Sequence, residues 1–449
     1  MSLATALDVD VAALTNSNST NNAPSGSDAA LNGRGNASKS SSVVLESARD
    51  GREGVDEDEA ALYDRQIRLW GLEAQNRMRR SHIFVVNLHG VATEAIKNVV
   101  LAGVGQVTIL DEGLVTPADL SAGFLLREDE IGVNRATAAL PRIQALNPLV
   151  KLETTSDFSI LRASKDSVSK HPLLQMGVNS LVVTLSSTNS TSSWTQERLI
   201  ELNNLARTLG LPFHLCSSQG FGGFYFSDLG PRHEYIVTRP AAAGSTAAPS
   251  AQAASAASTS TPQAAEPPPD ERNKASQPSQ QTSEKTQQKR IQEFVTLEQA
   301  LASDWKGKKR VRISPGVWAT WALWRYTSKQ LASGQRTVPA RVEDFTSEID
   351  ELLEAKGVSQ RSAFEQQGVD KNAFISTFLA AHDPANAGEL SPVCAILGGV
   401  LAQDLLNALG GREEPVCNWL QLEGLAGKGP VHNIGARPSQ VLLETRTNA

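Results

Sequence analysis

The sequence predicts an α/β protein built on a doubly wound, Rossmann-like parallel sheet. Two observations lead to this class. Short apolar runs rich in β-branched residues alternate with segments whose apolar residues recur every three to four positions, which is typical of buried parallel strands alternating with helices. The first strand, turn, helix and second strand also follow one another within about thirty residues, the length of one βαβ unit.

The same patterns assign the elements in chain order. We expect two helices separated at Gly71, a strand at 82–88, a helix from Ala92 to Gly103, a strand ending at Asp111, a helix at 133–146, a strand at 180–185, a helix at 193–209 and a strand at 212–216. The glycine-containing stretch up to Arg239 predicts antiparallel strands. Helices are expected over 291–382, where Trp318, Trp321 and Trp324 form a packed face, and over 391–409, which Gly410 ends.

Two segments have a composition that cannot form a core. They are dominated by Ser, Ala, Asn, Pro and Gln, and could not bury enough apolar surface to offset the entropy lost on ordering. We therefore divide the chain into a disordered N-terminal tail (1–56), the first part of the α/β domain (57–239), a disordered low-complexity linker (240–290), a helical insertion (291–390), the C-terminal part of the α/β domain (391–435) and a tail (436–449).

Composition excludes several classes of function. The 449 residues carry a formal net charge of −6, which argues against nucleic acid as the main partner. The three cysteines, Cys216, Cys394 and Cys417, share no CxxC spacing, so neither a disulfide scaffold nor a zinc site is expected. The N-terminus lacks a signal-peptide stretch and no continuous apolar run approaches membrane-spanning length. We expect a soluble, intracellular protein with no membrane partner.

The turn after the first strand is where a fold of this class binds a nucleotide. Its glycines let the backbone approach the phosphates at the helix N-terminus. Here the turn reads Asn87-Leu88-His89-Gly90, with side chains where glycines are expected. Because His89 would crowd a pyrophosphate, we expect a site that has lost nucleotide binding. Asp111 stands where a ribose-binding carboxylate would lie, and we expect it to be a solvated strand-end residue instead.

Four segments in the same order resemble the activating enzymes of ubiquitin-like proteins. They are YDRQIRLWGLEAQ (63–75), KNVVLAGVGQVTILDEGLVTPADL (97–120), FLLREDEIGVNRATAALPRIQALNP (124–148) and SPVCAILGGVLAQDLLNAL (391–409). The resemblance is greatest to the small, non-thioester subunit of heterodimeric SUMO-activating enzymes. It implies a Rossmann-like pseudo-adenylation domain of the ThiF/MoeB type, and a chain needed for adenylation of the SUMO C-terminus.

The resemblance also implies which parts of the enzyme lie elsewhere. In the family, ATP and Mg²⁺ are bound mainly by the large subunit, which also carries the thioester cysteine. Aligned on Phe124, this chain has Ser121, Ala122 and Gly123 in place of the Asn, Arg and Gln of an active half, and Ser186-Ser187-Thr188 replaces an acidic residue. We therefore expect this chain alone to hold no cofactor, and none of its cysteines to be the thioester nucleophile.

Arg65 is the residue to which the resemblance assigns a catalytic role. The matching arginine of the family reaches across the heterodimer to the ATP on the partner subunit, a role that suits a permanently charged, forked guanidinium. Arg68, one helical turn away, is the second candidate for nucleotide contact. The expected partners are the large subunit and SUMO, and the family implies the nucleus, with the cytoplasm also open; the basic run WKGKKRVR (305–312) is equally well explained as a solvated charge run.

Three alternatives remain open from the sequence. The chain could be the small subunit for another modifier, such as that of the neddylation pathway, although the short insertion at 291–382 favours SUMO. It could be a self-sufficient adenylating homodimer, which the altered glycine turn disfavours. It could also be a pure scaffold subunit, which differs from the first hypothesis only in whether Arg65 contacts ATP.

Overall fold

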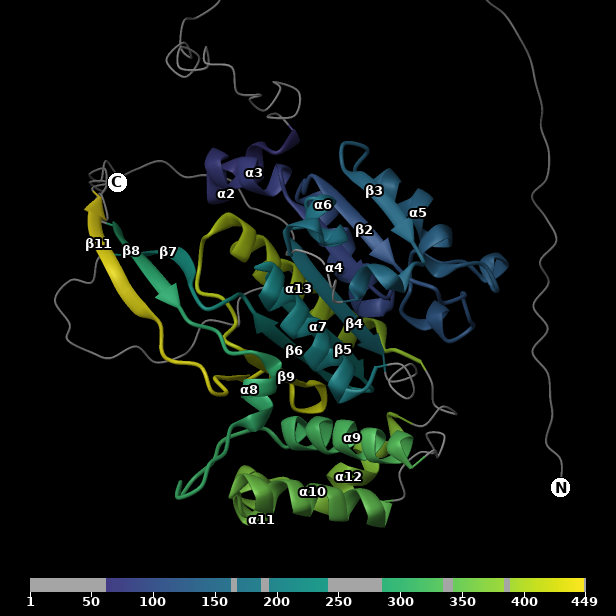
Figure 1. Cartoon of the computed structure of the whole chain (residues 1–449), viewed down its shortest axis with the longest axis vertical. Coiled ribbons are helices and arrows are strands. Elements are labelled where there is room, and N and C mark those ends of the chain that lie inside the picture. The colour runs from purple at the N-terminus through teal and green to yellow at the C-terminus, as the bar shows by residue number, and fades with distance from the viewer. Residues whose placement is uncertain are drawn as a thin grey trace, which may run out of the picture. The chain divides into compact units, whose positions relative to one another are not determined.

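The computed structural model describes residues 62–162, 168–186, 194–240, 285–333, 342–382 and 388–447 of the chain (Figure 1). All of them belong to one compact unit, Val55–Ala449. The tail predicted at 1–56 and most of the linker predicted at 240–290 lie outside the described residues.

An eight-stranded mixed sheet carries most of the fold, with strand order β10-β9-β6-β5-β4-β1-β2-β3. Its strands are β1 (His82–Val86), β2 (Gln106–Leu110), β3 (Lys151–Thr155), β4 (Ser180–Ser186), β5 (Phe213–Gln219), β6 (Gly222–Asp228), β9 (Trp419–Glu423) and β10 (Val431–His432). Strands β1 to β5 are parallel, whereas β6, β9 and β10 are antiparallel to their neighbours. The parallel order 3-2-1-4-5 is doubly wound, so the predicted fold class is confirmed.

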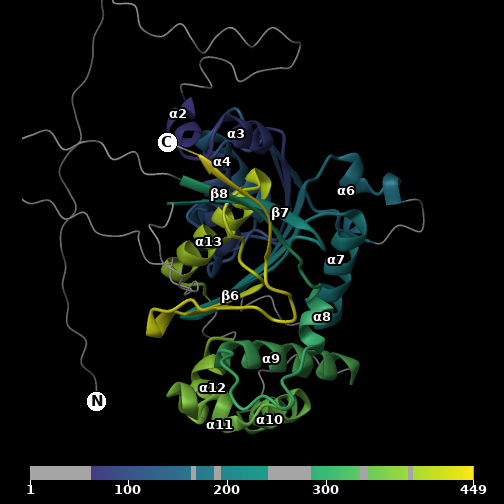
Figure 2. The same cartoon turned by 90° about the vertical axis from the view of Figure 1, so that its left-hand side faces the viewer.

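Helices pack on both faces of this sheet (Figure 2). They are α3 (Leu72–Arg79), α4 (Gly90–Leu101), α5 (Arg135–Leu146), α6 (Pro172–Gln175), α7 (Gln196–Leu209) and α13 (Ser391–Gly410). A further helix, α2 (Asp64–Trp70), precedes α3 and has no buried residue. Within β1, Ile83 and Val85 join the apolar cluster that contains α4, α5 and α13, while Phe84 and Val86 join the cluster that contains α7. Alternate side chains of one strand thus enter two cores, which is why the strand is apolar throughout.

Three further strands form a separate antiparallel sheet in the order β11-β8-β7. They are β7 (His233–Pro240), β8 (Lys285–Gln292) and β11 (Gln440–Thr447). Strand β8 begins inside the linker predicted at 240–290, and strand β11 lies inside the tail predicted at 436–449. Both predicted boundaries are therefore wrong at these strands. The sequence of β8, KTQQKRIQ, is almost entirely polar and is paired on both sides, so its strand character comes from backbone hydrogen bonding and not from an apolar pattern.

The helical insertion consists of α8 (Leu297–Ala302), α9 (Pro315–Ala332), α10 (Val342–Lys356), α11 (Gln360–Ala363) and α12 (Lys371–Ala380). Trp318, Trp321 and Trp324 are buried on α9, so the predicted packed face is confirmed. The rings of Trp321 and Trp324 lie 5.9 and 6.0 Å from that of Trp419 on β9. These aromatic contacts join the insertion to the antiparallel part of the large sheet.

Two elements show the limits of the apolar pattern. β3, KLETT, was not predicted, because it is a largely polar edge strand. Conversely, α13 is long and apolar enough to cross a membrane by length and composition alone, with a mean hydropathy of 1.6. Half of that window is buried, against α4 and the sheet, so α13 is a core helix of the α/β domain.

Candidate functional site

The turn between β1 and α4 is held in a conformation that glycine would adopt more easily. Asn87 has φ of 66°, in the left-handed region that asparagine tolerates better than most residues. Its side-chain amide donates a 2.9 Å hydrogen bond to the carbonyl of Thr184 on β4, which offsets part of the strain. His89 follows with 2% of its surface exposed, and burial, followed by the charge of Arg135, lowers its pKa. Burial thus favours the neutral ring of His89, whose Nδ1 lies 4.0 Å from a carboxylate oxygen of Asp119.

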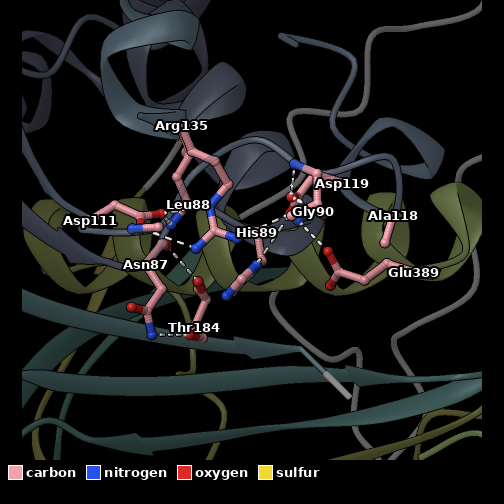
Figure 3. Close-up of polar contacts among 12 residues, drawn as sticks. Asn87, Leu88, His89, Gly90, Asp111, Ala118, Asp119, Arg135, Thr184 and Glu389 are labelled. Carbon is pink, nitrogen blue, oxygen red and sulfur yellow. Dashed lines mark hydrogen bonds and ion pairs between the residues drawn. The ribbon is translucent and has the colours of Figure 1, made fainter. Parts of the chain in front are cut away.

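A carboxylate of the chain accepts a hydrogen bond from the first backbone N–H of helix α4 (Figure 3). The backbone N–H of Gly90 donates a 2.6 Å hydrogen bond to Glu389, and the hydroxyl of Ser218, near the end of β5, donates to the other oxygen of the same carboxylate. A helix N-terminus attracts anions because its N–H groups are unpaired and its dipole is positive there. Glu389 thus stands where a phosphate would be expected.

The space beside Gly90 is also filled. A Cβ at this position would lie 2.8 Å from both the Cβ of Ala122 and the Sγ of Cys394. Ser121 donates a 3.0 Å hydrogen bond to the main-chain carbonyl of Glu389. Ser121, one of the small residues at 121–123 that differ from those expected of an active half, is therefore packed directly against the segment that carries Glu389.

Asp111, at the end of β2, is buried and fully engaged, so the expectation of a solvated residue is wrong. Its carboxylate accepts 2.7 Å hydrogen bonds from the N–H groups of Leu88 and Gly113, and two bonds of 3.0 Å from the guanidinium of Arg135. Arg135 also bonds Asp119 at 3.1 Å. With 1% of its surface exposed and four donors in place, Asp111 has no accessible oxygen for a ribose hydroxyl.

Comparison with known proteins identifies the family of the chain. Residues 63–174 match the ThiF family. SUMO-activating enzyme subunit 1 of Rattus norvegicus is 31% identical over 387 residues, which cover 85% of this chain and 96% of that protein. The protein of the same name from Danio rerio is 30% identical over 385 residues, covering 85% and 97%. The chain belongs to the SUMO-activating enzyme subunit 1 family.

Among solved structures, E. coli MccB in complex with MccA-N7isoASN overlaps with 83% of the chain and 72% of its own length, at a TM-score of 0.40 and 10% sequence identity. The sequence analysis predicted a resemblance to the small subunit of SUMO-activating enzymes, and the relatives named SUMO-activating enzyme subunit 1 confirm this family.

The two arginines singled out in this member of the family lie on α2, apart from the turn around Gly90. Arg68 forms an exposed ion pair of 3.0 Å with Asp64, one helical turn earlier. Arg65 is exposed, and within the described part of the chain its guanidinium has neither a hydrogen bond nor an ion pair. Of the two, only Arg65 presents an uncommitted guanidinium to a ligand outside this chain.

All three cysteines of this subunit are in environments that disfavour the thiolate. Cys216 and Cys394 are buried, and desolvation raises the pKa of both thiols well above the usual range. Burial also raises the pKa of Cys417 to about 12. A thiol that stays protonated at neutral pH is a poor nucleophile. Among the described residues, no group of three or more His, Cys, Asp or Glu side chains is placed to hold a metal ion.

Glu389 is the residue of this site that sequence reasoning missed. It follows the helical insertion and precedes α13 directly, and it lies 299 positions after Gly90 in the chain. A single acidic residue before a helix is common and predicts nothing by itself. Arg135 was likewise visible only as part of the family-like segment NRATAA, with no sign that it would pair with Asp111.

Proposed function

We propose that this chain is the non-thioester subunit of a heterodimer that activates SUMO. In that assembly it would be needed for ATP-dependent adenylation of the SUMO C-terminal carboxylate, and for the subsequent transfer of SUMO as a thioester to a cysteine of the large subunit. The proposal rests on one observation above all: the Glu389 carboxylate bound at the N–H of Gly90, in the place of a phosphate.

A nucleotide does not fit the residues present at this turn. A phosphate at the N-terminus of α4 would have to displace the Glu389 carboxylate, because Glu389 is 8% exposed and its carboxylate accepts hydrogen bonds from Gly90, Ser218 and the thiol of Cys394. Two anions in one buried place repel each other strongly. The ribose would find the Asp111 oxygens already bonded to Arg135. We therefore assign ATP and Mg²⁺ to the partner subunit.

Arg65 is the residue by which this chain would take part in the chemistry. Its guanidinium, which no other described residue engages, lies on an exposed helix and suits the phosphate oxygens of a nucleotide held by the partner. Placed there, it would offset the negative charge that builds up as pyrophosphate leaves, in the manner of arginine fingers. Arg68 is the second candidate, but it would first have to release Asp64.

The thioester step belongs to the large subunit in this proposal, because Cys216, Cys394 and Cys417 all have raised thiol pKa values. We place the heterodimer in the nucleus, with a share in the cytoplasm. The exposed cations at 306–312, between α8 and α9, are accessible to an import receptor. Nucleic acid and membranes are not among the proposed partners.

The test is an ATP–pyrophosphate exchange assay with SUMO, run on the purified chain, on its co-purified partner, and on both together. The partner is first identified by mass spectrometry after a pull-down with tagged chain. We expect exchange only when both subunits are present, and no binding of ATP by this chain alone in equilibrium dialysis. Exchange by the chain alone would support the homodimer instead. Recovery of a partner that activates a different modifier, such as that of the neddylation pathway, would reassign the substrate.

A further inference from the structure

Helix α2, which carries Arg65, is held in place by its two ends. None of its seven residues is buried, so packing of its own side chains contributes little to its position. A helix this short is not stable in water by itself, because its few hydrogen bonds do not offset the cost of nucleation. The residues around its ends are different: Tyr63, just before α2, is 2% exposed, and Gln75, on α3, is fully buried.

Tyr63 connects the start of α2 to the end of α4. A Cβ on Gly103 would lie 2.5 Å from a ring carbon of Tyr63, so the ring is in direct contact with the turn after α4. The phenol oxygen accepts a 2.7 Å hydrogen bond from the side-chain amide of Asn147, which also donates to the carbonyl of Val100 at 2.9 Å. The main-chain carbonyl of Tyr63 accepts a 2.8 Å bond from the N–H of Ile67, inside α2.

Trp70 connects the other end of α2 to the same place. Its indole N–H donates a 2.9 Å hydrogen bond to the side-chain oxygen of Gln75, and the Gln75 amide donates to the carbonyl of Ala102 at 3.0 Å. The last carbonyls of a helix have no partner four residues further on. Asn147 and Gln75 therefore bond main-chain oxygens at the C-terminal end of α4, and each also bonds a residue at one end of α2.

We propose that Tyr63 and Trp70 are positioning residues for Arg65: they fix both ends of α2 and so decide where its guanidinium stands. This inference rests on the proposed function and adds to it the residues that place Arg65. Among the described residues, no group bonds the Arg65 guanidinium, so its placement depends on the backbone that carries it. A displacement of about 1 Å at a reacting centre can cost about a hundredfold in rate, which makes this support part of the reaction.

The experiment removes the two hydrogen bonds and keeps an aromatic ring at each position. The double variant Tyr63→Phe, Trp70→Phe is compared with Tyr225→Phe, whose lost hydroxyl is also buried but donates to Asp404, in the core, at 2.6 Å. We expect the double variant to lower kcat of ATP–pyrophosphate exchange about three- to tenfold, with KM for ATP unchanged. Tyr225→Phe should lower the melting temperature and leave kcat unchanged. Subunit concentrations are set so that size-exclusion chromatography shows only heterodimer.

Repeating the double substitution in an Arg65→Ala chain separates positioning from general structural damage. If Tyr63 and Trp70 act through Arg65, they should cause no further loss of kcat once Arg65 is gone. The same fold-loss in both backgrounds would overturn the positioning role. So would a wild-type kcat for the double variant, or its failure to form the heterodimer.

The same measurements show which of the two proposals fails. A slow Arg65→Ala enzyme beside a fully active double variant would overturn the positioning role and leave the proposed function intact. Full activity of Arg65→Ala would instead exclude Arg65 from the proposed function, and the positioning role with it. Single Tyr63→Phe, which changes one atom, gives the same reading if the double variant does not fold.

Discussion

The carboxylate of Glu389 accepts a 2.6 Å hydrogen bond from the backbone N–H of Gly90, 299 positions earlier in the chain. This bond joins the segment that returns from the helical insertion to the first helix of the α/β domain. It also satisfies a helix N-terminus that would otherwise need a ligand or water. The chain thus carries its own anion at a place where related folds bind phosphate.

Removing that anion should destabilise the protein. In Glu389→Ala the N–H of Gly90 and the hydroxyl of Ser218 lose their partner in a buried place, and we expect a loss of roughly 1–3 kcal/mol in the free energy of unfolding. Glu389→Gln keeps one acceptor oxygen and should lose less. Urea unfolding followed by fluorescence measures both, with Glu354→Ala, an exposed glutamate of α10, as the control. Equal stability of Glu389→Ala and wild type would show that the contact contributes nothing.

The pairing of Asp111 with Arg135 should be worth far more than the pairing of Asp64 with Arg68. Asp111→Ala leaves the buried Arg135 guanidinium with Asp119 alone, and breaking a buried pair costs about 3–5 kcal/mol. Arg68→Ala removes an exposed pair and should cost less than about 1 kcal/mol. Chemical denaturation of the two variants decides the matter. Similar costs for both would mean that water reaches the pair at Asp111.

Arg65→Ala should slow adenylation without separating the subunits. Losing one charge-assisted contact corresponds to roughly 1.5–3 kcal/mol, or about ten- to a hundredfold in the exchange rate. Size-exclusion chromatography of the mixed subunits should still give the heterodimer, and Arg68→Ala should retain most of the activity. A wild-type exchange rate for Arg65→Ala would remove this residue from the mechanism and leave the chain a scaffold.

Stability should fall as the solution becomes acidic. Burial lowers the pKa of His214 to about 3, and those of His233 and His432 to about 4, from 6.5. Below about pH 6.5 the unfolded chain therefore binds more protons than the folded chain. The free energy of unfolding then decreases as the pH falls, until the pH drops below the folded-state pKa values of these histidines. Asp404 opposes this trend, because burial raises its pKa to about 6 from 3.8, and the folded form takes up that proton first.

Three histidines outweigh one carboxyl, so the melting temperature should be lower near pH 5 than near pH 7. Scanning calorimetry across this range measures the slope. His233→Gln removes one of the three groups and should make the dependence shallower. A melting temperature that rises on acidification would mean that Asp404 dominates and that the histidines are more hydrated than their burial indicates.

Local patterns predicted the elements whose apolar residues follow one period. The helix predicted at 133–146 corresponds to α5, which buries one face, and the strand predicted at 180–185 corresponds to β4, which is buried on both faces. Burial of this kind requires the regular apolar pattern from which both were predicted. β3, β8 and β11 escaped prediction, since edge or solvated strands need no apolar run and are defined by their neighbours' backbone. For the site, the altered turn at 87–90 could be recognised from the sequence, but the Glu389 carboxylate that binds there could not.

By itself, the sequence determined the doubly wound layers, the insertion with its tryptophan face, and the loss of glycines at the nucleotide turn, because each follows from residue types at fixed local spacing. Tertiary structure alone decided that Glu389 reaches Gly90 and that Arg135 engages Asp111. It also decided that, among the described residues, Arg68 pairs with Asp64 while the guanidinium of Arg65 has no partner. These are contacts between side chains brought together by the path of the chain. A hydrogen bond depends on positions within a few tenths of an ångström, and no periodicity in sequence encodes them.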